Sequence, residues 1–183
     1  GADEAYLMTD RMFAGSDTLA TSMILAAGIK KVGCDIVLTG RQAIDGDTAQ
    51  VGPQIAQFLG LPQITYCVGL DLNGDEFVLR RQFEDRYQML RVKPPFLATV
   101  LSSMAKPRYM NVKGIISQDA VNVNVITFAD LDLEAAEIGL KGSPTKVKTT
   151  FTKQTNSDKD LIELPVREAA NLIALKLSEK HYI

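Results

Sequence analysis

The residues best suited to chemistry lie together in one stretch, GRQAIDGDTAQVGP, which runs from Gly40 to Pro53. The stretch follows a short apolar run, DIVLT, and leads into a segment whose apolar residues have helical spacing. Ligands of open α/β sheets bind at the carboxyl ends of the strands, which is the position that this stretch occupies. The sequence therefore predicts a ligand-binding loop between a strand and a helix.

The loop offers hydrogen-bond donors for a phosphate. If the helix begins near Thr48, the amides of Asp47, Thr48 and Ala49 are free donors at the positive end of the helix dipole. Thr48 and Gln50 add side-chain donors. We therefore expect these residues to hold an anionic ligand.

An interpretation without any ligand also fits part of the loop. Asp45 or Asp47 would cap the helix, since aspartate is a favoured N-cap residue, and Gly46 would complete the turn. In the binding interpretation, Gly46 and Gly52 instead allow the backbone to approach the ligand closely. The loop by itself leaves both interpretations open.

Composition excludes several kinds of function. The chain has 183 residues, 46% of them apolar, and a net charge of -2, so we expect no binding to nucleic acid. The longest apolar run, Phe96 to Leu101, is far shorter than the roughly 20 residues of a membrane-spanning helix, so we expect a soluble, cytoplasmic protein. The single histidine, His181, lies near the end, which removes mechanisms that need a histidine base in the core. Cys34 and Cys67 have no companion metal ligands, and we expect them to be buried, reduced thiols.

The N-terminal part of the chain follows an α/β pattern. We expect a strand, a helix, a strand, a helix and a strand, joined by parallel crossovers, at residues 5–9, 18–31, 35–39, 48–59 and 63–70. Asn73-Gly74 then signals a hairpin, and residues 76–83, 86–92 and 96–101 continue in strand rhythm as an antiparallel or mixed section.

The rest of the chain is less regular. A short helix is expected at residues 111–118, an irregular arm at 119–155, and a last amphipathic helix after Pro165. The fold class is therefore α/β, a doubly wound and mostly parallel sheet with a C-terminal arm and helix. We expect two domains, 1–118 for ligand binding and 119–183 for the arm and helix.

Two stretches carry a resemblance to a known family. GRQAIDGDTAQVGPQIAQFLGLPQITY resembles the nucleotide-binding loop of electron transfer flavoprotein beta subunits, and GADEAYLMTDRMFAGSDTLATS resembles the strand and helix before that loop. The resemblance covers essentially all 183 residues and implies a fold like that of adenine nucleotide alpha hydrolases.

A further stretch resembles the signature segment of the same family, with one departure. The matching positions in the segment from residue 81 to 99 are Arg81, Glu84, Asp85, Gln88 and Pro95. Arg86 stands where the family prefers a glycine or an acid, so no role is carried over to Arg86.

The resemblance implies a cofactor and its binding residues. The cofactor is AMP, or a second FAD in the flavin-bifurcating branch. The residues that surround its phosphates are Gly40, Asp45, Gly46, Asp47, Thr48, Ala49, Gln50 and Val51. It implies an electron carrier subunit rather than an enzyme, with no catalytic residue and no metal, because the flavin does the chemistry. GLKGSPTKV, at residues 139–147, resembles the arm of beta subunits from anaerobes, which favours the FAD version with NADH as electron donor.

The resemblance also implies partners. They are an alpha subunit, onto which residues 119–183 dock, and an acyl-CoA dehydrogenase-type flavoenzyme. KPRYMNVKGII resembles the segment that recognises this dehydrogenase, with Val112 as the anchoring residue and Tyr109 and Ile115 beside it. By the sequence alone, an ordinary helix that packs Val112, Ile115 and Ile116 inward is favoured, because an apolar stripe more often belongs to a core than to an interface, and the resemblance reverses this for Val112 only.

Family members begin with a further strand, helix and strand before a Gly-Ala-Asp like the one that opens this chain. The chain has no initiator methionine, so we expect that it lacks this segment, which contributes to the adenosine pocket in the family. Two other classes share part of the pattern. An adenine-nucleotide hydrolase or ligase would carry an SGGxDS-like loop, which is not found here. A stress-type nucleotide-binding protein would leave the PRY segment, the arm and the last helix unexplained.

Overall fold

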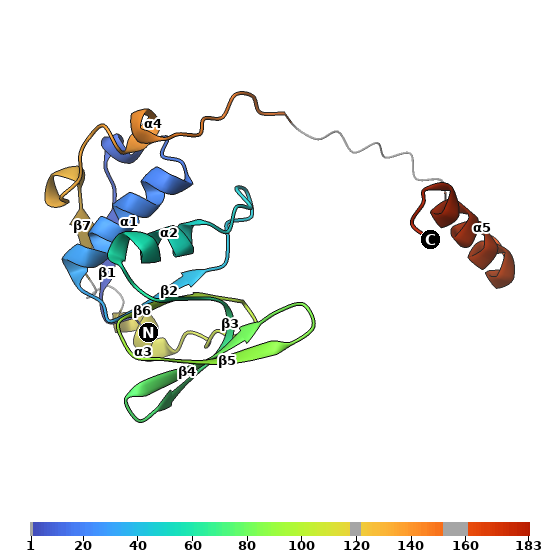
Figure 1. The fold of residues 1–183 in the computed structure, drawn as a ribbon, viewed down its shortest axis with the longest axis horizontal. Helices are drawn as coiled ribbons and strands as arrows, with labels where there is room; N and C mark the ends of the chain where they lie inside the picture. Colours follow the sequence, from blue (N-terminus) through green and yellow to red (C-terminus); the bar gives the residue numbers. More distant parts are fainter. Residues whose placement is uncertain (1, 118–121, 152–160) are drawn as a thin grey trace. The chain divides into compact units, whose positions relative to one another are not determined.

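A computed structural model describes residues 2–117, 122–151 and 161–183 (Figure 1). The contacts between residues divide the chain into two units, Gly1–Lys146 and Val147–Ile183. The sequence predicts a domain boundary after residue 118. The second domain is defined there by its docking on a partner chain, which the structure of one chain does not test, so that boundary stays a prediction.

The described residues form seven strands and five α-helices. The strands are β1 (Ala5–Met8), β2 (Ile36–Gly40), β3 (Gln63–Asn73), β4 (Glu76–Gln82), β5 (Tyr87–Val92), β6 (Phe96–Val100) and β7 (Val123–Ile126). The helices are α1 (Thr18–Val32), α2 (Val51–Leu59), α3 (Val112–Ser117), α4 (Gly139–Gly142) and α5 (Val166–Glu179). No helix in this part of the chain is long and apolar enough to cross a membrane.

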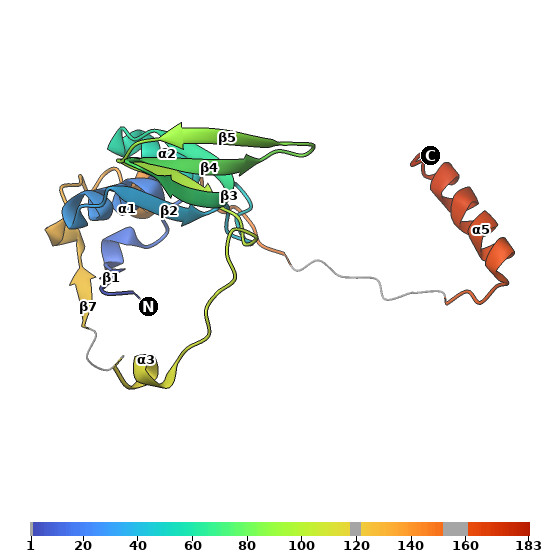
Figure 2. The ribbon, with the colours of Figure 1, turned by 90° about the horizontal axis from the view of Figure 1, so that it is seen from below.

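A five-stranded sheet forms the centre of the first unit, in the order β2-β6-β3-β4-β5 (Figures 1 and 2). Strands β2, β6 and β3 run parallel, whereas β3, β4 and β5 form an antiparallel meander through the hairpin at Asn73-Gly74. A mixed α/β fold with mostly parallel strands is confirmed, since three of the five strand pairs of the described residues are parallel.

Strand β6 decides between the two arrangements expected for residues 76–101, antiparallel or mixed, in favour of the mixed one. It lies between β2 and β3 and is parallel to both. Four successive residues, Phe96 to Thr99, are buried, so the strand is covered on both faces. A continuous apolar run is typical of such a strand, and this explains the pattern that the sequence shows there.

Two apolar clusters cover the two faces of this sheet. Side chains of α1 and α2, including Ala26 and Ile55, pack against Val37 and Leu97 of the central strands. On the other face, Phe96 packs with side chains of the β3–β5 meander, and its ring centroid lies 5.5 Å from that of Phe77. Helices α1 and α2 therefore lie side by side on one face, which brings their N-terminal ends near each other (Figure 1).

Strand β1 lies in a separate sheet. It pairs in parallel with β7, which comes more than a hundred residues later, and Ala5 lies opposite Val123. The local order of strand, helix and strand was predicted correctly, but the expected parallel crossover from β1 to β2 is wrong for the described residues, because β1 pairs with β7 in a separate sheet.

The two cysteines differ in their environment. Cys67 is buried in β3, as expected, but Cys34 is exposed in the turn between α1 and β2, so the prediction of two buried thiols is wrong for Cys34. Gly33, with φ 79°, ends α1, and the turn that follows faces solvent.

Candidate functional site

The candidate loop begins where two parallel strands end. Gly40, the last residue of β2, lies opposite Val100, the last residue of β6. A hollow of about 480 Å³ opens there and is lined by Gly40, Arg41, Gln42, Val100, Leu101 and Ser102. Residues 41–48 are all exposed, so the loop is accessible to a ligand in the described chain.

The loop uses its own carboxylates to hold its shape. The amide of Asp47 donates to the carbonyl of Ala43 at 3.0 Å, and the amide of Gly46 donates to Asp45 Oδ1 at 2.9 Å. The side-chain amide of Gln42 donates to Asp47 Oδ1. Neither aspartate caps α2, which contradicts the interpretation of the loop as a plain N-cap and turn.

Helix α2 begins at Val51, three residues later than predicted. Asp47 and Ala49 have φ angles of 47° and 53°, which a right-handed helix cannot contain. Gln50, which precedes the helix, has right-handed dihedral angles and makes no side-chain capping hydrogen bond. The start of α2 is therefore uncapped.

The amides just before and within this helix start are free donors. Among the described residues, no acceptor is found for the five successive amides of residues 48–52, whereas the amide of Asp47 is engaged by Ala43. Asp47 was predicted to contribute a free amide, and this is wrong. Ala49, with φ 53°, is followed by Gln50 with right-handed dihedral angles, and alternation of handedness in successive residues is the backbone pattern of anion-binding nests. The helix dipole adds positive potential at the same place.

Gly52 has a packing role that the sequence did not reveal. A Cβ atom at Gly52 would lie 2.6 Å from Thr99 Cγ2 and 2.7 Å from Thr39 Oγ1, so only glycine lets α2 approach β2 and β6 this closely. A Cβ atom at Gly46 would meet nothing within 4 Å. Thr39 Oγ1 is buried without a hydrogen-bond partner in the described chain. In the sequence, only the presence of a threonine at the end of an apolar strand pointed to this buried hydroxyl.

The N-terminal end of α1 holds the start of α2. Thr18 Oγ1 donates to Gln50 Oε1 at 3.2 Å. The hydroxyl of Ser22, which is fully buried, lies 2.6 Å from the carbonyl oxygen of Thr18, 2.9 Å from Gln54 Oε1 and 3.4 Å from the carbonyl oxygen of Val51. These contacts fix the helix start from one side, and they were not predicted.

Arg41 is the only basic residue between Gly40 and Pro53, and its guanidinium lies 5.9 Å from the ring centroid of Tyr66. It takes part in no salt bridge within the described residues. The hydroxyl of Thr99 holds Tyr66 by accepting from its amide at 3.0 Å. Tyr66 itself has φ 57°, at an irregularity in β3, which the sequence gave no reason to expect.

The second candidate site, at residues 109–116, lies on the surface. Val112 and Ile116 are each 73% exposed, and no residue of α3 is buried. Tyr109 and Ile115 are exposed as well. The interpretation of this segment as a helix that packs its apolar side chains inward is therefore wrong. In the described residues, no group of acidic, histidine or cysteine side chains is arranged to hold a metal ion.

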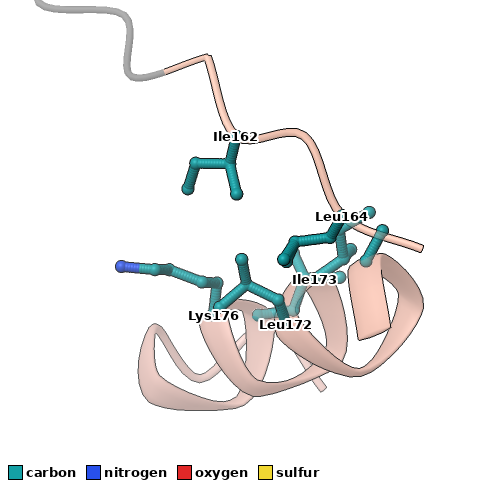
Figure 3. Close-up of a pocket in the computed structure, with 7 residues that line it drawn as sticks. Ile162, Leu164, Leu172, Ile173 and Lys176 are labelled. Atoms are coloured by element: carbon teal, nitrogen blue, oxygen red, sulfur yellow. The ribbon is translucent and has the colours of Figure 1, made fainter. Parts of the chain in front are cut away.

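The second unit presents an apolar groove of its own. Ile162 and Leu164, from the segment before α5, lie beside Leu172 and Ile173 of the helix (Figure 3). The groove encloses about 380 Å³, and Lys176 lies at its edge. Ile162 and Ile173 are more than half exposed, so this face is not covered within the unit.

Comparison with known proteins identifies the family of the chain. Residues 1–131 match the electron transfer flavoprotein domain. The chain is 51% identical, over all its residues, to the electron transfer flavoprotein subunit beta of Clostridium acetobutylicum, and it covers 71% of that protein. This chain belongs to the electron transfer flavoprotein beta subunits.

Other electron transfer flavoprotein relatives bear names that describe complexes. Subunit CarD of the caffeyl-CoA reductase-Etf complex of Acetobacterium woodii is 45% identical over the whole chain, which covers 71% of it. The acryloyl-CoA reductase electron transfer subunit gamma of Anaerotignum propionicum is 42% identical, again over the whole chain, which covers 72% of it. As an electron transfer flavoprotein beta subunit, the chain takes part in flavin-linked electron transfer together with a partner subunit, and an adenine-nucleotide hydrolase or ligase is not favoured.

Proposed function

We propose that the free amides of residues 48–52 bind the phosphate of an adenine nucleotide. The observation that carries this proposal is the row of five amides without acceptors at the uncapped start of α2. A phosphate has several acceptor oxygens and would satisfy these donors at the positive end of the helix. Thr48 adds a hydroxyl, while Gln50 is oriented by Thr18.

The nucleotide is AMP or the corresponding half of FAD. Bound AMP would only stabilise the fold, whereas bound FAD would accept electrons from NADH and pass them on. One relative is by name a subunit of a CoA reductase-Etf complex and another an electron transfer subunit of a CoA reductase, and the resemblance of residues 139–147 to the arm of beta subunits from anaerobes favours the FAD version. In either version the residues of this chain bind and orient the nucleotide. We assign no catalytic acid, base or nucleophile to them.

We also propose two partner surfaces. The exposed apolar side chains Tyr109, Val112 and Ile115 would contact an acyl-CoA dehydrogenase-type flavoenzyme. The groove of the second unit would bind the alpha subunit, because an uncovered apolar helix face of this kind favours contact with another chain (Figure 3).

The experiment is a count of nucleotides. The full-length protein is co-expressed with its alpha subunit, the purified complex is denatured, and the released AMP and FAD are quantified by chromatography. One FAD with one AMP for each complex supports the AMP version, and two FAD support the FAD version. A complex that releases a single FAD and no AMP would refute the proposed function, because no nucleotide is then left for the beta subunit.

A further inference from the structure

The N-terminal end of α1 binds a second segment besides the nucleotide loop. Residues 138–145, here named the arm root, lead from the first unit toward the second. Ser143 in the arm root is only 4% exposed, and its hydroxyl accepts from the amide of Asp17 at 2.8 Å. The same hydroxyl donates to the carbonyl of Gly139 at 2.6 Å. The arm root is thus built into the start of α1.

The carboxylate of Asp17 serves two segments at once. Its Oδ1 atom caps α1 by accepting from the amides of Leu19 at 3.0 Å and Ala20 at 3.1 Å. Its Oδ2 atom accepts from the amide of Thr145 at 2.9 Å and from the hydroxyl of Thr145 at 2.7 Å. One side chain therefore joins the helix start to the last residues of the first unit.

The local backbone shows that this contact is close and specific. Gly139 has φ 65°, and a Cβ atom there would lie 2.4 Å from the carbonyl oxygen of Met12. Its amide donates to Ser16 Oγ at 3.0 Å. A Cβ atom at Gly142 would lie 2.0 Å from the carbonyl carbon of Glu137. Only glycine fits at these positions of the arm root, which explains both glycines of GLKGSPT.

The same end of α1 contacts the proposed phosphate site. Thr18 follows Asp17 directly, and its hydroxyl donates to the side-chain oxygen of Gln50. The backbone amide of Gln50 is one of the free donors. One turn later, Ser22 contacts Gln54 and the carbonyl of Val51. A ligand that fixes Gln50 and Val51 therefore also restrains the helix end that holds Thr145.

We propose that Asp17 is a positioning residue that couples nucleotide binding at residues 48–52 to the position of the arm root. The inference rests on the proposed function. Because such coupling is reciprocal, a bound nucleotide strengthens the contact between Asp17 and Thr145, and an arm held in place strengthens nucleotide binding. The place where the arm leaves the first unit thus depends on whether the site is filled.

The test compares variants that separate capping from the contact with the arm root. In Asp17→Asn the amide oxygen still caps α1, but its NH2 group cannot accept from Thr145. Thr145→Val removes the hydroxyl donor, and Thr145→Ser keeps it. Amide hydrogen exchange of the peptide that contains Thr145 is measured in the full-length protein with its alpha subunit, with and without AMP, and AMP binding is measured separately by calorimetry.

We expect AMP to slow exchange at Thr145 in the wild type and in Thr145→Ser, by a factor on the order of five or more. This slowing should be absent in Asp17→Asn and reduced in Thr145→Val. If AMP binds but exchange at Thr145 does not change, or changes equally in Asp17→Asn, the coupling is refuted and the nucleotide site stands. If neither AMP nor FAD binds to the wild type at residues 48–52, the proposed function fails and the inference with it.

Discussion

At the scale of single residues, the proposed phosphate site consists mainly of backbone. Asp45 and Asp47 hold the loop, and the left-handed Ala49 turns the amides that follow it. A phosphate bound this way depends on the shape of the loop more than on any one side chain. Substitutions that disturb the seating of α2 are therefore expected to affect the site.

Gly52→Ala tests this seating. The added methyl group would collide with Thr99 and Thr39, at 2.6 and 2.7 Å, so it must push α2 away from the sheet. We expect the free energy of unfolding to fall by about 1 to 3 kcal/mol, as is usual for overpacking. Urea unfolding measures it, and Gly46→Ala is the matched control, because that position opens to free space. Equal stability of the two variants would contradict the packing role of Gly52.

The thiols provide a second test at this scale. Burial raises the pKa of Cys67 to about 11, although the nearby Arg81 opposes this rise. The reactive form is the thiolate, so at pH 8 only about 0.1% of Cys67 is reactive. We expect iodoacetamide at pH 8 to alkylate the exposed Cys34 and to spare Cys67 until urea unfolds the protein. Mass spectrometry of tryptic peptides separates the two sites, and fast labelling of native Cys67 would contradict the described burial.

The sequence predicted the position of the loop but not its conformation. Gly40 to Pro53 was found because glycines, carboxylates and hydroxyls follow an apolar strand. The start of α2 was misplaced because Asp47 and Ala49 adopt positive φ angles, for which glycine is the usual signal. Thr39 and Tyr66 were missed, since their surroundings come from strands distant in sequence.

At the scale of elements, helix α3 is short and has no buried residue. Its apolar side chains contribute little to the fold of the described chain, so we expect their substitution to change partner binding rather than stability. This separates α3 from α1 and α2, whose apolar side chains form the core.

Val112→Ala should slow the reduction of the complex by its dehydrogenase without loss of flavin. We expect a rate lowered by about fivefold to thirtyfold, the range for truncation of an interface residue worth 1 to 2 kcal/mol. Stopped-flow absorbance of the flavin measures the rate. Val123→Ala, at a comparably exposed valine of β7, is the control. Equal rates for Val112→Ala and the wild type would refute the docking role of Val112.

Elements with strong local patterns were predicted well, and their pairing was not. Helix α1 begins at its Asp17 cap and ends at Gly33, close to the expected limits. Strand β6 is buried on both faces, as its run of apolar residues indicates, and this agrees with its central place in the sheet. From the sequence it was grouped with the neighbouring hairpin, so that place was not predicted. Register and order depend on contacts between distant segments.

At the scale of the whole molecule, the two units differ in the features that they contain. The first contains the sheet, the proposed phosphate site and the arm root, and the second presents an apolar groove. The parallel pairing of β1 with β7 and the binding of the arm root to Asp17 both join distant parts of the first unit. Neither was predicted, because short polar and apolar segments of this kind carry no signal of their partners.

Ile173→Glu tests the role of the second unit. A charge in the apolar groove should weaken binding of the alpha subunit by at least tenfold, because the carboxylate would be desolvated at the interface. Asn171→Glu adds the same charge on the opposite side of α5 and should bind as the wild type does. Analytical ultracentrifugation of the two subunits gives the dissociation constants, and equal constants for the two variants would refute docking through this groove.

The central claim is that the free amides of residues 48–52 hold a nucleotide phosphate. The most direct measurement is amide hydrogen exchange of this segment in the full-length protein with its alpha subunit, with and without AMP. The structure predicts slower exchange at residues 48–52 when AMP is bound. Bound AMP with unchanged exchange of these amides would contradict the claim.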